Sequence, residues 1–119
     1  MKMLKRIISH LVIMLAILIP VANGAESKTG QEQIIIDVRT EAEWTTGHLE
    51  GAVLIPFERI GEAISVVTAD KKAKIYLYCR TGRRTGIAFD TLKKAGYENL
   101  INLETVENAA KVLGRNVVK

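Results

Sequence analysis

Cysteine and histidine are scarce in this sequence. Its 119 residues include one cysteine, Cys79, and two histidines, His10 and His48. A single cysteine cannot form an internal disulfide, so packing of the core must hold the fold together. One cysteine and two separated histidines do not make the ligand set of a zinc site. We therefore predict no metal, and nothing in the sequence suggests an organic cofactor.

Excess positive charge is also scarce outside the N-terminus. The chain has a formal net charge of +4 and a pI near 9.3. Three of the 17 basic residues, Lys2, Lys5 and Arg6, precede the first acidic residue, Glu26, so the rest of the chain is nearly neutral. A nucleic-acid-binding surface needs a concentration of basic residues. No nucleic-acid partner is predicted.

Residues 1–24 have the organisation of a secretory signal peptide. A basic segment at 1–6 precedes an apolar segment at 11–19, which Pro20 ends. Small residues at 22–24 then provide a cleavage site before Ala25. We expect the mature protein to be periplasmic or secreted.

A membrane anchor is the alternative reading of this N-terminal segment. The apolar run is short for a membrane-spanning helix, which needs about 20 residues. Extended back to residue 7, the segment would be an uncleaved anchor, and only then would the membrane be a partner. No cysteine follows the apolar run, which excludes a bacterial lipoprotein anchor. Residues 25–32 are polar and are predicted to form a flexible leader.

Strand-like and helix-like segments alternate along residues 33–119. Short runs rich in Ile, Val, Leu and Tyr predict strands, and apolar residues at helical spacing predict helices. A capping box of Thr40 and Glu43 predicts a short helix, and the two glycines in 47–52 predict a turn. This alternation indicates one α/β domain with a mainly parallel sheet. The strands are predicted at 33–38, 53–55, 74–78 and 99–103. Besides the short capped helix, helices are predicted at 57–67, 86–95 and 104–113.

The single cysteine lies between the strand 74–78 and the helix 86–95. Ligands of parallel sheets bind beyond the carboxyl ends of the strands, which is where Cys79 falls. Backbone N–H groups at the start of a helix favour an anion at such a position. The sequence therefore predicts a reactive thiolate in a turn that contains Gly82.

Three arginines reinforce this prediction. Arg80, Arg83 and Arg84 surround the turn and add positive charge, which lowers the pKa of a nearby thiol. A thiolate in a nest of amides can attack a soft electrophile and hold an anionic product. The alternative is an inert buried cysteine, and it requires the strand, glycine, arginines and helix start to coincide by chance.

The pattern Cys-x-x-Gly-x-Arg-Thr, from Cys79 to Thr85, resembles the active-site loop of rhodanese-type sulfurtransferases. Cys-based tyrosine phosphatases share the strand–Cys–helix arrangement, but their pattern is Cys-x5-Arg. Here the sixth residue after Cys79 is Thr85, and Arg84 comes one position earlier. The shorter loop resembles the sulfur-transfer class, whose tighter ring suits a persulfide better than a phosphate.

A second block of residues strengthens the resemblance. Asp37-Val38-Arg39, Glu43-Trp44 and the segment from Gly47 to Pro56 are similar to the N-terminal signature of the rhodanese domain. With the short length and signal peptide, the chain looks most like the exported single-domain rhodaneses related to phage-shock protein E. This implies a three-layer α/β domain over residues 33–119.

The same resemblance implies structural rather than catalytic roles for the first block. In that family the Asp, Arg and Glu at Asp37, Arg39 and Glu43 chiefly tie strand ends to the loop by ion pairs. His48 is implied to be a scaffold residue, although a Cys–His pair is a common way to activate a nucleophile. Trp44 is expected to belong to the core.

One segment departs from the family pattern. Rhodaneses usually follow the last strand with a Gly-Gly pair, whereas residues 103–108 here contain no glycine. We expect side chains to crowd the rim of the site, and Glu104 or Glu107 to repel an anionic donor.

Together these residues predict an exported thiosulfate sulfurtransferase. Cys79 would accept sulfur as a persulfide and pass it to cyanide or a thiol. Arg84 and Arg83 are the expected sulfonate ligands, Arg80 raises the local potential, and the amides from Thr81 through Gly82 to Thr85 cradle the outer sulfur. Its partners are thus a small sulfur donor and a thiophilic acceptor. The alternatives are a non-catalytic sulfur carrier or binding module and a Cys-based phosphatase or arsenate reductase.

Overall fold

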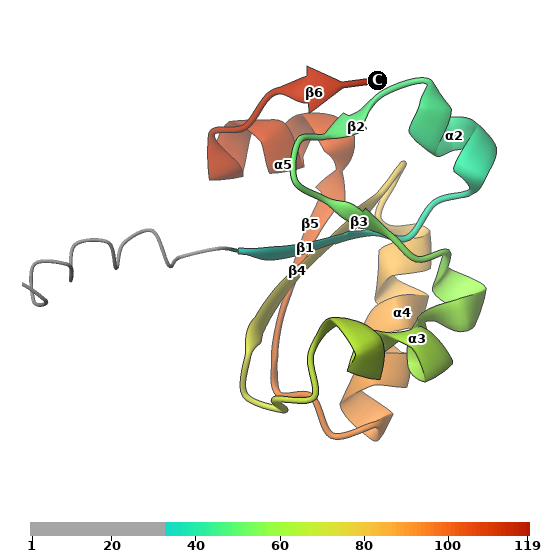
Figure 1. Cartoon of the computed structure of the whole chain (residues 1–119), viewed down its shortest axis with the longest axis vertical. Coiled ribbons are helices and arrows are strands. Elements are labelled where there is room, and N and C mark those ends of the chain that lie inside the picture. Colours follow the sequence, from blue (N-terminus) through green and yellow to red (C-terminus); the bar gives the residue numbers. More distant parts are fainter. Residues whose placement is uncertain (1–32) are drawn as a thin grey trace, which may run out of the picture. The chain divides into compact units, whose positions relative to one another are not determined.

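The computed structural model describes residues 33–119, and the predicted signal peptide and leader lie outside these residues. A four-stranded sheet in the order β3-β1-β4-β5 forms the centre of the domain (Figure 1). Every neighbouring pair in this sheet is parallel, as the alternation of elements predicted. Its strands are β1 (Ile34–Asp37), β3 (Val53–Leu54), β4 (Lys74–Cys79) and β5 (Asn99–Thr105).

Helices cover both faces of the sheet because alternate strand residues point to opposite sides. On one face, Ile36, Leu77 and Cys79 belong to a buried cluster with residues of α3 (Ile60–Val67) and α4 (Arg83–Lys94). On the other face, Ile35 and Tyr78 belong to a cluster with residues of α5 (Val106–Leu113). The predicted three-layer α/β architecture is confirmed.

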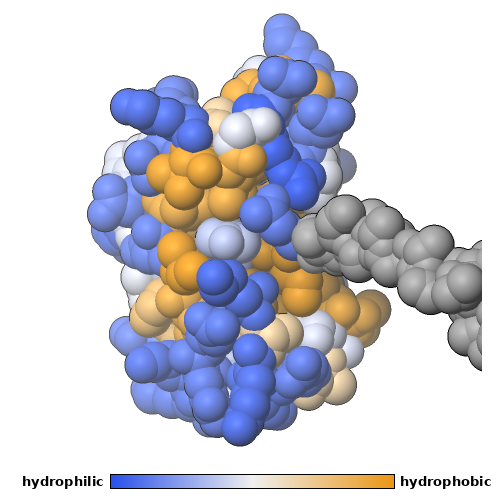
Figure 2. Space-filling model, turned by 90° about the vertical axis from the view of Figure 1, so that its left-hand side faces the viewer, coloured by the Kyte–Doolittle hydropathy of each residue, from blue (hydrophilic) through white to orange (hydrophobic). Residues whose placement is uncertain are grey.

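The second cluster has fewer buried residues than the first, and partly buried apolar residues pack against both clusters. Figure 2 shows the side of the domain that is on the left in Figure 1, where apolar residues occupy the middle and hydrophilic residues border them. Most of the tightly packed interior, including Cys79, therefore lies on the α3 and α4 side of the sheet.

The short helix predicted after Thr40 is present as α2 (Glu41–Thr45). The Thr40 hydroxyl accepts the Glu43 N–H, and the Glu43 carboxylate accepts the Thr40 N–H, which completes the predicted capping box. The helix predicted at 57–67 is divided: a 3-10 turn, η1 (Phe57–Arg59), follows Pro56 and leads into α3.

Two helices begin at other positions than predicted. Helix α4 starts at Arg83 instead of 86, because Gly82 adopts φ 99° as its N-cap and the chain enters the helix directly. Helix α5 starts at Val106 instead of 104, because the Thr105 hydroxyl caps it by accepting the N–H of Asn108. Strand β5 correspondingly continues to Thr105.

A second, two-stranded sheet was not predicted. β2 (His48–Leu49) lies in the segment expected to be a turn, and it pairs antiparallel with β6 (Val117–Val118). The guanidinium of Arg115 secures this C-terminal segment by donating to the Glu50 carbonyl, 3.1 Å away. Strands of two residues are too short to show an alternating pattern in a sequence.

The helices in residues 33–119 are all too short or too polar to cross a membrane.

Candidate active site

Cys79 is the last residue of β4, at the carboxyl end of the central sheet. Its side chain belongs to the core cluster beneath α4, and the residue has an exposed fraction of 0%. Residues 80–82 form the turn that connects it to α4, as the sequence predicted. The nucleophile candidate is therefore buried in the core, in contact with the N-cap residue of α4.

The sulfur of Cys79 accepts a backbone hydrogen bond and lies near the Thr85 hydroxyl, which itself donates to the Gly82 carbonyl at 2.7 Å. The Gly82 N–H donates to Sγ at 2.9 Å, and the hydroxyl oxygen of Thr85 lies 3.8 Å from it. Burial raises the pKa of the Cys79 thiol, but the backbone amides of Thr85, Gly82 and Thr81, with the Thr85 hydroxyl, lower this pKa by more. The net pKa lies below the ordinary value, so the site stabilises a thiolate.

The Arg84 side chain is engaged in an ion pair with Glu43. Its Nη1 and Nη2 donate to the two carboxylate oxygens of Glu43 at 2.8 and 2.9 Å, a forked pairing between α4 and α2. The hydrogen bonds from Arg84 lower the pKa of Glu43 to about 2, so the carboxylate is charged at any ordinary assay pH. Only 18% of the Arg84 side chain is exposed.

The three loop arginines occupy different surroundings. The Arg80 side chain is 73% exposed, and its Nη1 lies 3.9 Å from the second Glu43 oxygen. Arg83 is exposed and lines a separate hollow with Asn102 and α4 residues. Thr81 is exposed, and its hydroxyl lies 3.5 Å from the Arg83 N–H. Of the three arginines that the sequence placed around one anion, Arg80 and Arg84 therefore converge on the Glu43 carboxylate, whereas Arg83 lies apart.

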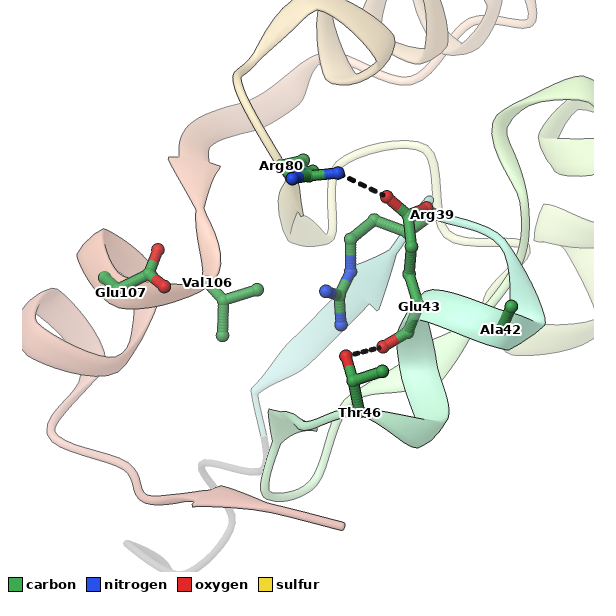
Figure 3. A pocket seen from close by; sticks show the side chains of 7 residues that line it. All are labelled: Arg39, Ala42, Glu43, Thr46, Arg80, Val106 and Glu107. Carbon is green, nitrogen blue, oxygen red and sulfur yellow. Dashed lines mark hydrogen bonds and ion pairs between the residues drawn. The ribbon is translucent and has the colours of Figure 1, made fainter.

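A cavity of about 420 Å³ opens between α2, the Cys79 loop and α5. Figure 3 shows the Glu43 carboxylate beside Arg80, the Arg39 guanidinium in the middle of the view, and Glu107 on the far side of Val106. Sequence reasoning had not named Ala42, Thr46 or Val106 as lining residues, and apolar or small side chains carry no motif that would have indicated them. The lining residues are Arg39, Ala42, Glu43, Thr46, Arg80, Val106 and Glu107.

Arg39, which lines this cavity, forms a buried ion pair with Asp37. Arg39 Nη2 lies 2.8 Å from Asp37 Oδ2 and also donates to the carbonyl of Gly47 at 2.7 Å. Its guanidinium lies 5.7 Å from the centre of the Tyr78 ring. This pairing ties the end of β1 to the segment after α2, which agrees with a structural role.

His48 is likewise engaged with the scaffold. Its Nδ1 lies 3.0 Å from the Trp44 carbonyl, and its ring stacks on the Trp44 indole with centroids 3.5 Å apart. Trp44 is half-buried and is not among the residues of either core cluster. Both contacts orient His48 toward α2, which fits a scaffold residue better than a base.

The family model for the rhodanese-like domain matches residues 22–105. The chain belongs to this family. The chain is 38% identical over 78 residues to the probable adenylyltransferase/sulfurtransferase MoeZ of Mycobacterium tuberculosis, covering 64% of this chain but 19% of MoeZ. It is 32% identical over 75 residues to the thiosulfate sulfurtransferase PspE of Escherichia coli, covering 63% of this chain and 72% of PspE.

Rhodanese-like relatives differ in the activity that their names describe. The putative sulfur carrier protein YrkF of Bacillus subtilis is 33% identical over 69 residues, covering 58% of this chain and 36% of YrkF. Among solved structures, an Escherichia coli rhodanese determined with anions matches with a TM-score of 0.67 at 30% identity. That match covers 73% of this chain and 98% of the other.

Residues 103–108, the segment without the usual glycine pair, include an unusual backbone conformation at Glu104. It is the only residue other than glycine in 33–119 with a positive φ, at 66°. An extra residue in β5 opposite the step from Leu77 to Tyr78 forms a bulge, after which Glu104 pairs with Tyr78. A left-handed backbone costs a residue other than glycine about 1–3 kcal/mol. Sequence alone indicated the missing glycine but not this conformation.

No group of three or more potential metal ligands occurs in the part of the chain that the structure describes.

Proposed function

We propose that this rhodanese-like domain is a thiosulfate sulfurtransferase that works through a persulfide on Cys79. The observation that carries the proposal is the Gly82 N–H bond to Sγ at the carboxyl end of β4, in a turn that lowers the thiol pKa. In the first step the Cys79 thiolate attacks the outer sulfur of thiosulfate. A new S–S bond forms, the S–S bond of thiosulfate breaks, and its electron pair leaves with sulfite.

In the second step a thiophilic acceptor removes the outer sulfur. Cyanide or a thiolate attacks this sulfur, the Cys79 S–S bond breaks, and its electron pair returns to Sγ as a thiolate. The amides that lower the thiol pKa supply the same donors to a persulfide anion. No proton or external oxidant is needed in either step.

Donor entry is proposed to occur through the cavity beside Arg80. This arginine directly follows Cys79, lines the cavity and is the most exposed of the charged groups around Glu43. The similar Escherichia coli rhodanese was solved with anions, which supports an anionic donor for this chain. Because Sγ is buried, side chains around the loop must shift before the donor reaches it.

Intact-mass spectrometry with thiosulfate tests the proposal. The reduced protein should gain the mass of one sulfur atom, lose it on addition of cyanide, and produce thiocyanate in repeated turnovers. A persulfide that forms but turns over no further would make the protein a sulfur carrier, as the name of its relative YrkF describes. Hydrolysis of an aryl phosphate without sulfur uptake would point to a phosphatase.

Export is a second part of the proposal. It rests on the basic and apolar segments of residues 1–24, which lie outside the described residues. Protein isolated from its native host should begin at or near Ala25 and be periplasmic or secreted, as N-terminal sequencing of cell fractions would show. Recovery of the chain with Met1 intact in the membrane fraction would instead identify an uncleaved anchor.

A further inference from the structure

The α5 side of the Cys79 loop carries two carboxylates, Glu104 and Glu107, here called the acidic rim. Glu104 is exposed and precedes Thr105, which pairs with Cys79 in the sheet. Glu107 lines the cavity together with Arg80 (Figure 3). Glu107 therefore borders the cavity, whereas Glu104 is not one of its lining residues and lies beside the end of the strand that carries Cys79.

Glu104 lies directly against the turn that binds the sulfur. A β-carbon placed on Gly82 would be 3.3 Å from Glu104 Cγ and 3.4 Å from its Cβ. The N–H of this same Gly82 donates to Cys79 Sγ. The Glu104 side chain is thus separated from the reactive sulfur by one glycine.

Fold stability does not account for a glutamate at this position. Its φ of 66° favours glycine or asparagine, and its N–H donates to the Asn102 side chain as that of another residue would. Within residues 33–119 its carboxylate has no ion-pair partner within 4.0 Å. Glu107, in contrast, lies in the first turn of α5, where an acidic residue is stabilising.

In the part of the chain that the structure describes, the ion pairs around the loop do not include the rim carboxylates. Arg84 is paired with Glu43, and Arg39 is paired with Asp37. Arg80 lies 3.9 Å from Glu43. Within residues 33–119 both rim carboxylates are therefore left out of these ion pairs, as is the exposed Arg83.

We infer that Glu104 determines which acceptor thiols this site prefers: it disfavours an acceptor thiol that carries a carboxylate and favours one that carries a protonated amine. The inference rests on the proposed persulfide chemistry for its substrate class. The thiolate of an aminothiol attacks the outer persulfide sulfur, the Cys79 S–S bond breaks, and a hydropersulfide of the acceptor leaves. The ammonium group of the attacking aminothiol remains near the Glu104 carboxylate during the attack.

Alkylation of Cys79 tests the selectivity without requiring any sulfur transfer. Iodoacetamide is neutral and iodoacetate is an anion of similar size, so the ratio of their rate constants reports the local charge. Glu104→Gln should raise the iodoacetate rate about threefold relative to iodoacetamide, the effect of one partly screened charge at close range. Glu104→Asn should do the same in a residue that accepts the left-handed backbone.

Glu98→Gln is the matched control, since it removes the same charge at the opposite end of β5, before Asn99. It should leave the reagent ratio unchanged. An unchanged ratio in Glu104→Gln, or an equal change in Glu98→Gln, would overturn the inference. The alkylation rates can be measured even if the protein transfers no sulfur, so a failure of the proposed function is distinguished from a failure of this inference.

Acceptor thiols of similar size then test the substrate class. Persulfide discharge should be measured with cysteamine, 2-mercaptoethanol and 3-mercaptopropionate, which are cationic, neutral and anionic. Glu104→Gln should slow cysteamine and accelerate 3-mercaptopropionate, each by about threefold, and leave 2-mercaptoethanol unchanged. Each variant is compared with the parent for the same thiol, so differences in thiol ionisation cancel. A uniform change with all three thiols would contradict the inference.

Discussion

Replacing Cys79 by serine should abolish sulfur transfer and retain the fold. The serine hydroxyl occupies nearly the same volume in the cluster beneath α4 and still accepts the Gly82 N–H. It is far harder to ionise than a thiol and cannot form a persulfide, so both proposed steps lose their nucleophile. Thiocyanate formation from thiosulfate and cyanide should fall to the background rate, with the circular dichroism melting curve close to that of the parent.

The thiolate itself can be examined in the parent protein. Because the folded pKa of Cys79 lies below its ordinary value, the rate of alkylation should reach its plateau at a lower pH than for a free cysteine. Thiocyanate formation by Cys79→Ser near the parent rate would exclude Cys79 as the nucleophile. A folded Cys79→Ser protein without activity, beside a parent with a shifted alkylation profile, would support it.

The strands and the cysteine turn were predictable because their signals are local. β1 and β4 are short apolar runs, and the position of Cys79 follows from the strand before it and the glycine after it. The capping box of Thr40 and Glu43 was visible for the same reason. A resemblance that joined two separate blocks of sequence then indicated the three-layer fold.

What the sequence could not provide depends on contacts between distant segments. β2 and β6 have two residues each and form only because the C-terminus returns to the segment after α2. The partner of Arg84 is Glu43, 41 positions earlier; the family resemblance implied an ion pair from Glu43 to the loop, but no spacing rule indicated which arginine would form it. This second case changes the mechanism, because it engages the arginine that the sequence assigned to the donor.

Arg84→Ala should lower kcat/KM for thiosulfate by roughly one to two decades, the effect of losing a charge-assisted contact of about 1.5–3 kcal/mol. The structure supplies two reasons for such a loss. Arg84 contributes positive charge near Cys79, where it can bind the sulfonate, and its pairing with Glu43 also fixes α2 against α4. Arg84→Lys should recover part of the charge effect but not the forked geometry. Arg80→Ala should have the smaller effect, because that side chain is largely exposed to solvent.

Glu43→Gln separates the two reasons by the sign of its effect. If Arg84 binds the sulfonate, neutralising Glu43 releases the guanidinium for the donor, and KM for thiosulfate should fall. If Arg84 serves only to fix α2 against α4, Glu43→Gln should weaken the same contact and reproduce the loss seen in Arg84→Ala. The double variant, with both Arg84 and Glu43 replaced, completes a double-mutant cycle. If Arg84 only fixes α2 against α4, the double variant should lose no more kcat/KM for thiosulfate than either single variant. Thermal melts of all three variants must show a folded domain. Parent values of kcat and KM in Arg84→Ala would exclude this arginine from donor binding and leave Arg80 and Arg83 as the groups to replace next.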